Sequence, residues 1–188
     1  MTRSHPFLCS HPATNHPSLK ARRPRRAGLA WLALLLPFAA TAALWNVRPG
    51  PDAKATPWAV VSSAGGDELA VFRDKNNEVH LRFSIAGTFN RLAPRHCPTF
   101  QFDAAQPLYH LAIEESCHID SKHALIDLGT VRNRVLVSAA VDQLMNGTRI
   151  EFRYVSADGG YHEADFPLKG SSLAIRRALG RDVRVRAR

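Results

Sequence analysis

The sequence lacks the signatures of several enzyme and binding classes. It has no Gly-x-Ser-x-Gly motif, the strand–turn–helix elbow that exposes a hydrolase serine. "KGSSLA" at Lys169–Ala174 is instead typical of a turn followed by a helix cap. None of its predicted strands is a predominantly basic one with interleaved aromatic residues, as in sheets that bind single-stranded nucleic acid. A Ser–His–Asp set stays open, because six histidines follow residue 57: His80, His96, His110, His118, His123 and His162.

Acidic residues are missing from the N-terminal part of the chain. Residues 1–26 carry six basic side chains and no acid, whereas residues 57–179 carry 13 basic and 14 acidic ones. The formal net charge of +9 therefore comes from the ends, where Gly180–Arg188 adds four arginines and one aspartate. A nucleic-acid-binding domain normally has a basic face, so the nearly neutral body predicts no nucleic-acid partner.

Charge is absent altogether from Ala27–Trp45, "AGLAWLALLLPFAATAALW". As a helix, these 19 residues span about 28 Å, close to the hydrocarbon core of a bilayer, about 30 Å thick. Four arginines precede the segment directly and set its orientation: Arg22, Arg23, Arg25 and Arg26. Because positive flanks stay in the cytoplasm, the sequence predicts a single-pass inner-membrane protein with a cytoplasmic N-terminus and a periplasmic C-terminal body.

Two interpretations of this segment are open. It is either an uncleaved signal anchor, which we favour, or a signal peptide that is cleaved near Ala42 after Ala40-Thr41-Ala42. Both place the body outside the cytoplasm. Residues 1–26 contain "SHP", "SHP" and "NHP", and we expect a basic, disordered cytoplasmic arm, although its histidines and Cys9 could bind a transition metal loosely.

The body is predicted to be rich in strands. Residues 46–57 contain three prolines and are expected to form an extended linker. From Trp58 onward, alternating polar and apolar residues predict nine short strands: 58–63, 68–73, 78–85, 99–103, 108–114, 123–128, 134–138, 148–156 and 161–168. "DKNNE" and "SADGGY" are typical of hairpin turns, and "AGGDEL" at Ala64–Leu69 is interpreted as a hairpin loop rather than a cyclase motif.

Two short helices are expected within this pattern. Ser138 is placed to cap the first and Gly147 to end it, and the second runs from Ser171 or Ser172 to Gly180. The predicted fold is therefore mainly β: one N-terminal transmembrane helix, then a small antiparallel β sandwich or partial barrel with one or two short helices over residues 58–180. Residues 181–188 are expected to be a frayed basic tail that could also bind anionic lipid headgroups or an acidic partner.

Cysteine is scarce, and two of the three cysteines stand next to histidines, in "RHCPTF" and "ESCHID". Adjacent Cys–His pairs suit a zinc site poorly, because neighbouring side chains on an extended strand point to opposite faces. In an exported domain two cysteines normally oxidise together. We therefore predict a Cys97–Cys117 disulfide, which closes a loop of about 21 residues and contributes about 3 kcal/mol. A metal site that uses another histidine stays open.

The C-terminal portion resembles the invasion-associated locus B family of exported bacterial proteins. The similarity lies in Cys117, Leu144–Gly147, the hairpin Arg149–Phe166, "FPLKG" at Phe166–Gly170 and Ala174–Leu179, and Trp58 suits that family's first strand. This resemblance implies a β-rich, disulfide-containing envelope protein without known catalysis. We therefore expect a non-enzymatic binding or envelope-assembly module without a cofactor, whose partners are the inner membrane and an envelope protein. An exported hydrolase or a metal-binding periplasmic protein is the alternative.

Overall fold

The computed structural model describes residues 44–51, 56–103 and 117–187, all of which belong to one compact unit, Ala40–Arg188. The elements are β1 (Asn46–Arg48), β2 (Trp58–Ser62), β3 (Glu68–Arg73), β4 (Glu78–Ser84), β5 (Thr99–Phe102), β6 (Cys117–Ile119), β7 (His123–Thr130), β8 (Val135–Val137), α1 (Ala139–Asn146), β9 (Arg149–Val155), β10 (Tyr161–Pro167), α2 (Ser171–Leu179) and β11 (Arg184–Arg186). The unit is mainly β, as predicted. The strand predicted at 108–114 lies outside the described residues.

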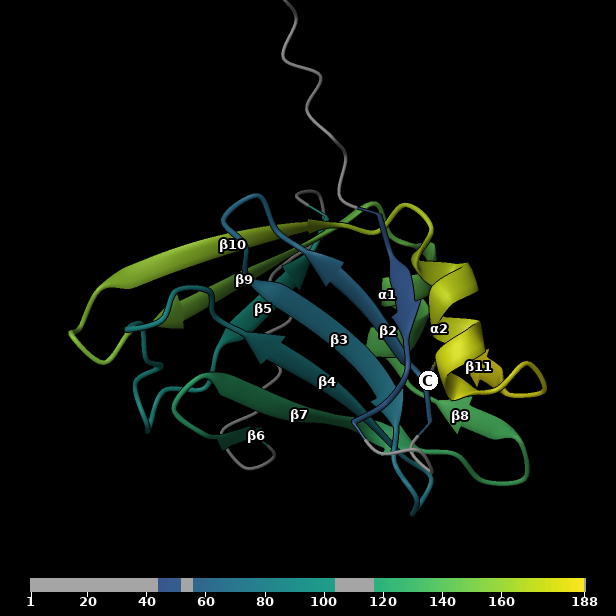
Figure 1. The fold of residues 1–188 in the computed structure, drawn as a ribbon. Helices are drawn as coiled ribbons and strands as arrows, with labels where there is room; N and C mark the ends of the chain where they lie inside the picture. Colours follow the sequence, from purple (N-terminus) through teal and green to yellow (C-terminus); the bar gives the residue numbers. More distant parts are fainter. Residues whose placement is uncertain (1–43, 52–55, 104–116, 188) are drawn as a thin grey trace, which may run out of the picture. The chain divides into compact units, whose positions relative to one another are not determined.

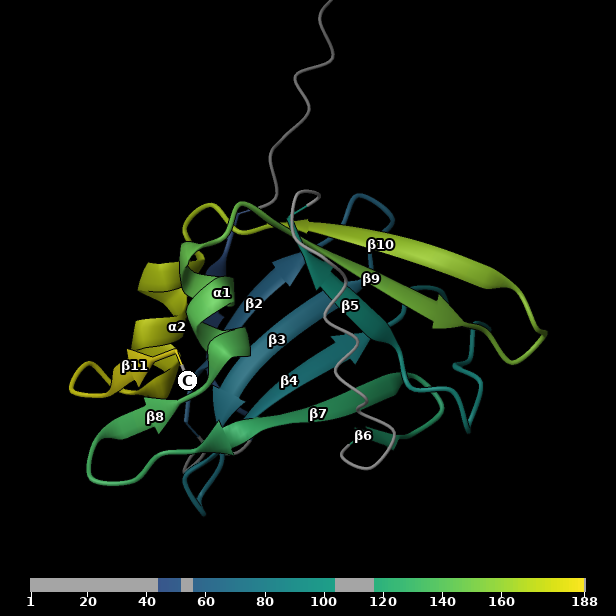
Figure 2. The same cartoon turned by 180° about the vertical axis from the view of Figure 1, so that it is seen from behind.

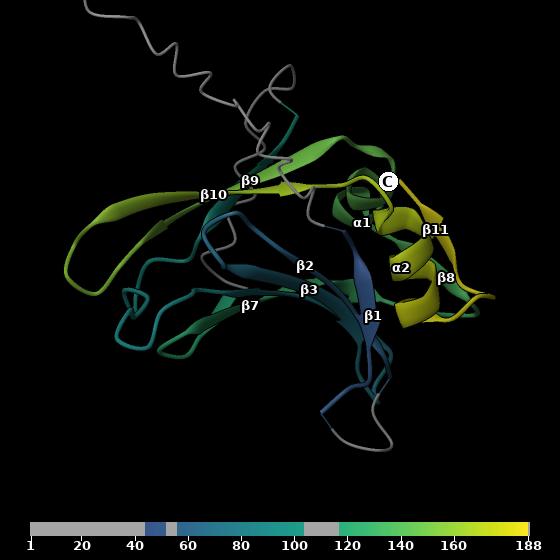
Figure 3. The ribbon, with the colours of Figure 1, turned by 45° about the horizontal axis from the view of Figure 1, so that its top comes forward.

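Most of the strands form two antiparallel sheets. The larger sheet has the order β1-β2-β3-β4-β7-β6, and the smaller one has the order β10-β9-β5. Figure 1 views the outer face of the larger sheet, with β5 and β9 behind it, and Figure 2 shows β5 and α1 from the other side. In Figure 3 the hairpin of β9 and β10 forms one layer and the larger sheet the next.

The core lies between these layers and is built by the predicted alternation. Phe83 of β4 stacks on Phe152 of β9 with their ring centroids 4.8 Å apart, and Phe166 of β10 meets both rings edge-on. All three side chains are fully buried. The opposite face of β4 carries Glu78, His80, Arg82 and Ser84, as the period of two requires.

The two helices close one end of the core. The Ser138 side chain accepts a hydrogen bond from the Val141 amide, and α1 ends before Gly147, as predicted. Helix α2 begins after Gly170, which has a positive φ of 88°. The Ser171 hydroxyl, fully buried, donates to the Leu144 carbonyl at 2.6 Å and so ties α2 to α1.

Two segments differ from the expectation. Part of the predicted linker 46–57 is a strand, because Asn46–Arg48 pairs with Trp58–Val60 at the edge of the larger sheet. Trp45, predicted to end the membrane segment, is 8% exposed in the core, and its indole nitrogen donates to the Pro167 carbonyl at 2.8 Å. Asn46–Arg48 therefore belongs to the sheet rather than to a linker, and the membrane segment predicted at 27–45 extends too far, because Trp45 belongs to the core.

The second difference is the C-terminal tail. Instead of fraying, Arg184–Arg186 forms β11, which pairs in parallel with β8. Val183, just before it, is 4% exposed. Burial of Val183 and Val185 holds the segment in place, while Arg184 and Arg186 remain in solvent.

Candidate functional site

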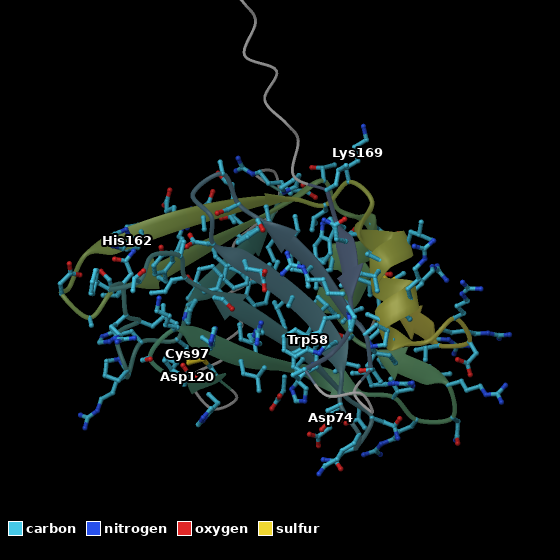
Figure 4. The ribbon with its side chains drawn as sticks, viewed as in Figure 1. Trp58, Asp74, Cys97, Asp120, His162 and Lys169 are labelled. Carbon is cyan, nitrogen blue, oxygen red and sulfur yellow. A yellow bond between two sulfur atoms is a disulfide. The ribbon has the colours of Figure 1, made fainter. Side chains whose placement is uncertain are left out.

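Seven exposed arginines lie on α2, the turn that follows it, β11 and the β7–β8 connection. We call them the arginine surface: Arg132, Arg134, Arg176, Arg177, Arg181, Arg184 and Arg186. In Figure 4, nitrogen-tipped side chains gather around α2, β11 and β8. Asp182 is the one acidic residue in these segments, and its carboxylate lies 3.3 Å from Nε of Arg134. The surface therefore has a strong positive charge, although residues 57–179, which supply four of its arginines, are nearly neutral in total.

The local backbone brings these arginines together from distant parts of the sequence. Gly180 follows the last residue of α2, and its φ of +108° turns the chain toward β11. The Arg184 amide then donates to the Arg134 carbonyl at 2.8 Å. In the parallel register Arg184 is beside Val135 and Arg186 beside Val137, so these four side chains share one side of the ribbon.

Apolar side chains are exposed among the arginines. Val137 is 53% exposed and Leu173 59%. A shallow hollow of about 340 Å³ is lined by Thr130, Arg132, Val135 and Val137. The side chains of α2, β8 and β11 include no aromatic ring. The surface can therefore offer cations and aliphatic contacts, but these three elements provide no stacking platform for bases.

The predicted disulfide is present. Cys97 and Cys117 are bonded, with their Cα atoms 6.1 Å apart. Cys117 begins β6 at the edge of the larger sheet, and Cys97 lies in the segment that leads into β5 of the smaller one. The bond therefore joins the two sheets. The neighbouring His96 and His118 are both exposed, which agrees with their interpretation as neighbours of a covalent cross-link.

One Ser–His–Asp set does come together, at the hairpin between β9 and β10. Nε2 of His162 lies 3.0 Å from Oγ of Ser156, but that hydroxyl also donates to Asp158. In a catalytic triad the carboxylate holds Nδ1 of the histidine, not the serine. Here the hydrogen bond from Ser156 lowers the pKa of Asp158, and the His162 ring stacks on Tyr154. This arrangement closes a turn and does not activate a nucleophile.

A buried histidine occupies the outer face of the larger sheet. The register pairs Arg48 with Trp58, Phe72 with His80, and His80 with Asp127, and a ring contact joins Trp58 to Phe72. Trp58 and Phe72 stack with their centroids 4.3 Å apart, and the Phe72 and His80 rings are 5.3 Å apart. Nδ1 of His80 lies 2.6 Å from Oδ1 of Asp127. The strand pattern predicted which face His80 is on, but the partner 47 residues away becomes visible only in the fold.

The "GGDE" letters have a structural role. Asp67 is 8% exposed; its carboxylate accepts from the Ala86 amide at 2.7 Å and from the Tyr154 hydroxyl at 3.4 Å. Burial and the Asp67 carboxylate raise the pKa of Tyr154 to about 12. The segment lies between β2 and β3, so the hairpin-loop interpretation is confirmed.

The predicted membrane segment lies mostly outside the described residues, as do Arg22, Arg23, Arg25 and Arg26. Within the described part of the chain, no helix has the length and apolar character needed to span a bilayer. Comparisons with protein-family models, curated proteins and solved structures find no match.

Proposed function

We propose that this chain is an exported, membrane-anchored binding module that docks on anionic lipid headgroups through the arginine surface. The observation that carries the proposal is the set of seven exposed arginines on α2, β11 and the adjoining connections, where Asp182 is the one acidic residue. Arginine binds phosphate groups in a bidentate manner, and each basic residue near an anionic membrane contributes about 1 kcal/mol of binding.

The surroundings of the arginines favour lipid over nucleic acid. Val137 and Leu173 expose aliphatic side chains among the charges, and such side chains enter the boundary between headgroups and acyl chains. The hollow beside Arg132 adds an apolar wall formed by Val135 and Val137. The predicted anchor would keep the domain near the membrane, so even weak contacts would be sustained by a high effective concentration.

The location, topology and role of the chain belong to the same proposal. We propose the periplasmic location, a single transmembrane helix that begins at residue 27 and ends before Leu44, and a non-enzymatic role in the envelope. The β-rich, disulfide-linked domain is in keeping with the resemblance to the invasion-associated locus B family. The Ser156 cluster lacks triad geometry, so the hydrolase alternative has no support from the hairpin.

The test compares the full chain in nanodiscs of phosphatidylcholine with nanodiscs in which part of this lipid is replaced by phosphatidylglycerol. Hydrogen exchange should slow in α2 and β11 only when the anionic lipid is present, and high salt should remove the difference. Arg184→Gln with Arg186→Gln should weaken the contact, by a factor of about five for each arginine.

The control variant carries the same loss of charge on other exposed residues, Lys75→Gln with Arg95→Gln, and should behave like wild type. Equal exchange in the two lipids would contradict the proposal. So would tight binding of a short DNA duplex by α2 and β11 without any effect of the lipid.

A further inference from the structure

We propose that Asp74, Glu78 and His80 form a binding site for one Zn²⁺ ion, oriented by Asp127. The site lies at the hairpin between β3 and β4, on the outer face of the larger sheet, close to Trp58 in Figure 4. Oxygen or nitrogen atoms of the three side chains lie within 4.8 Å of one another. The inference is independent of the arginine surface.

The histidine presents one nitrogen toward the two carboxylates. Its side chain is only 9% exposed, and Nδ1 is held by the Asp127 carboxylate at 2.6 Å. A carboxylate can only accept, so Nδ1 donates to Asp127, and Nε2 is the ring nitrogen that would bind a metal ion. Among the described residues, the nearest acidic atom to Nε2 is Oδ2 of Asp74 at 3.9 Å, too far for a hydrogen bond.

Nε2 of the buried ring and Oδ2 of Asp74 face one another without a hydrogen bond, 3.9 Å apart. Bonds to zinc of about 2.0–2.2 Å place two ligands of one ion about 3–4 Å apart. The separation between Nε2 and Oδ2 therefore suits a shared ion better than direct contact.

Backbone amides fix the carboxylate of Asp74 in this position. Oδ1 of Asp74 accepts from the amides of Asn76 and Glu78, each at 2.8 Å, which fixes the side chain and leaves Oδ2 toward His80. Glu78 is two residues before His80 on β4, so both side chains stand on the same face. Glu78 is exposed and can rotate to close the remaining distance.

The contact between His80 and Asp127 is the usual outer shell of a metal-bound histidine. Such a carboxylate fixes the tautomer and increases the basicity of the ligating nitrogen. A β-bulge interrupts the β4–β7 register between Val79 and His80 and sets Asp127 opposite the ring. One imidazole and two carboxylates favour Zn²⁺ over Ca²⁺, which takes oxygen ligands, and over Cu⁺, which takes sulfur ligands.

The test uses the full chain, stripped of metal with a chelator and titrated with ZnCl₂ against a chromophoric competitor. We expect one equivalent bound at this site and a higher midpoint of thermal unfolding. Asp74→Asn keeps an oxygen for the turn amides, and together with Glu78→Gln it should lower the affinity at least tenfold. Asp127→Asn should lower it by about 10- to 100-fold.

Two controls make the result specific. Glu163→Gln is an equivalent change at an exposed position of β10 and should leave zinc binding unchanged. Replacing His5, His11 and His16 by Gln and Cys9 by Ser removes the candidate ligands of the N-terminal arm and should preserve the stabilised domain. His80 is buried, so its variants could unfold. The deciding variant is therefore Asp74→Asn with Glu78→Gln, which includes the exposed Glu78. Zinc affinity unchanged by Asp74→Asn with Glu78→Gln, or lost only in the arm variant, would overturn the proposal.

Discussion

At the scale of single residues, several charged side chains secure turns. Asp103 follows β5 with a φ of +43°, and its carboxylate accepts hydrogen bonds from the Thr148 hydroxyl, the Thr148 amide and the Arg149 amide. It therefore satisfies the backbone at the start of β9 in the way that an N-cap satisfies a helix. The hydroxyl of Thr148 is the main reason that the pKa of Asp103 lies below its ordinary value.

This contact predicts a specific dependence of stability on pH. Because the pKa of Asp103 is lower in the folded chain than in the unfolded one, its stabilisation is present above pH about 4. It is lost as the pH falls through the lowered pKa. Urea unfolding across this range should show that Asp103→Asn is less stable than wild type by about 1 kcal/mol at neutral pH.

The difference between the two proteins should shrink on acidification. Asp142→Asn provides the charge-matched control, since that side chain accepts from Asn146 within α1. A constant difference down to strongly acidic pH would rule out the proposed role of the Asp103 carboxylate.

At the scale of elements, the regular strands could be predicted, whereas of the four three-residue strands only β8 was. In β4, Val79, Leu81 and Phe83 alternate with polar residues, so its inner face was clear before the fold was known. By contrast β1, β6 and β11 have three residues each, too few for a period of two to show. Their structure depends on the strand beside them, and the parallel pairing of β11 with β8 links residues about fifty positions apart.

The candidate sites were harder to predict than the strands, because they too depend on residues that are distant in sequence. The Cys97–Cys117 bond followed from cysteine number and export, without any geometry. The arginine surface joins α2 to the β7–β8 connection, and His80 meets Asp127 across two strands. A sequence reveals the residue types in such clusters, but only tertiary contacts determine which of them meet.

Strand β11 should therefore be structural, and deletion of residues 181–188 tests this. The deletion removes the buried Val183 and half-buried Val185 and uncovers Leu136, which is fully buried. Burying one valine stabilises a fold by about 1.5–3 kcal/mol, so the free energy of unfolding should fall by about 3 kcal/mol or more in urea.

The matched variant keeps the strand and removes only its charge, by replacing Arg181, Arg184 and Arg186 with Gln. It should stay within about 1 kcal/mol of wild type, as exposed substitutions usually do. If the deletion has no larger effect than this variant, the tail makes no contribution to the core.

At the scale of the whole molecule, the disulfide and the predicted topology depend on one another. A Cys97–Cys117 bond persists in an oxidising compartment, and the predicted orientation places both cysteines there. A reporter that is active only in the periplasm, fused after Arg188, should therefore be active. Reductant should change the mobility of the same protein on a non-reducing gel.

The topology residues can be tested in the same assay. Replacing Arg22, Arg23, Arg25 and Arg26 with Asn removes the positive flank and should lower reporter activity and the oxidised fraction together. An inactive reporter on the wild-type chain would overturn the topology, and with it the membrane location of the arginine surface.

The pairing of β8 with β11 also bears on when this protein can fold. The core takes side chains from Trp45 through Val183, and β8 has its parallel partner only after the ribosome has synthesised residue 186. During synthesis at about 5–20 residues per second, the emerging chain stays incomplete for several seconds. Such a delay would keep the polypeptide unfolded. An unfolded chain can pass through a translocation channel before β11 pairs with β8 and completes the domain.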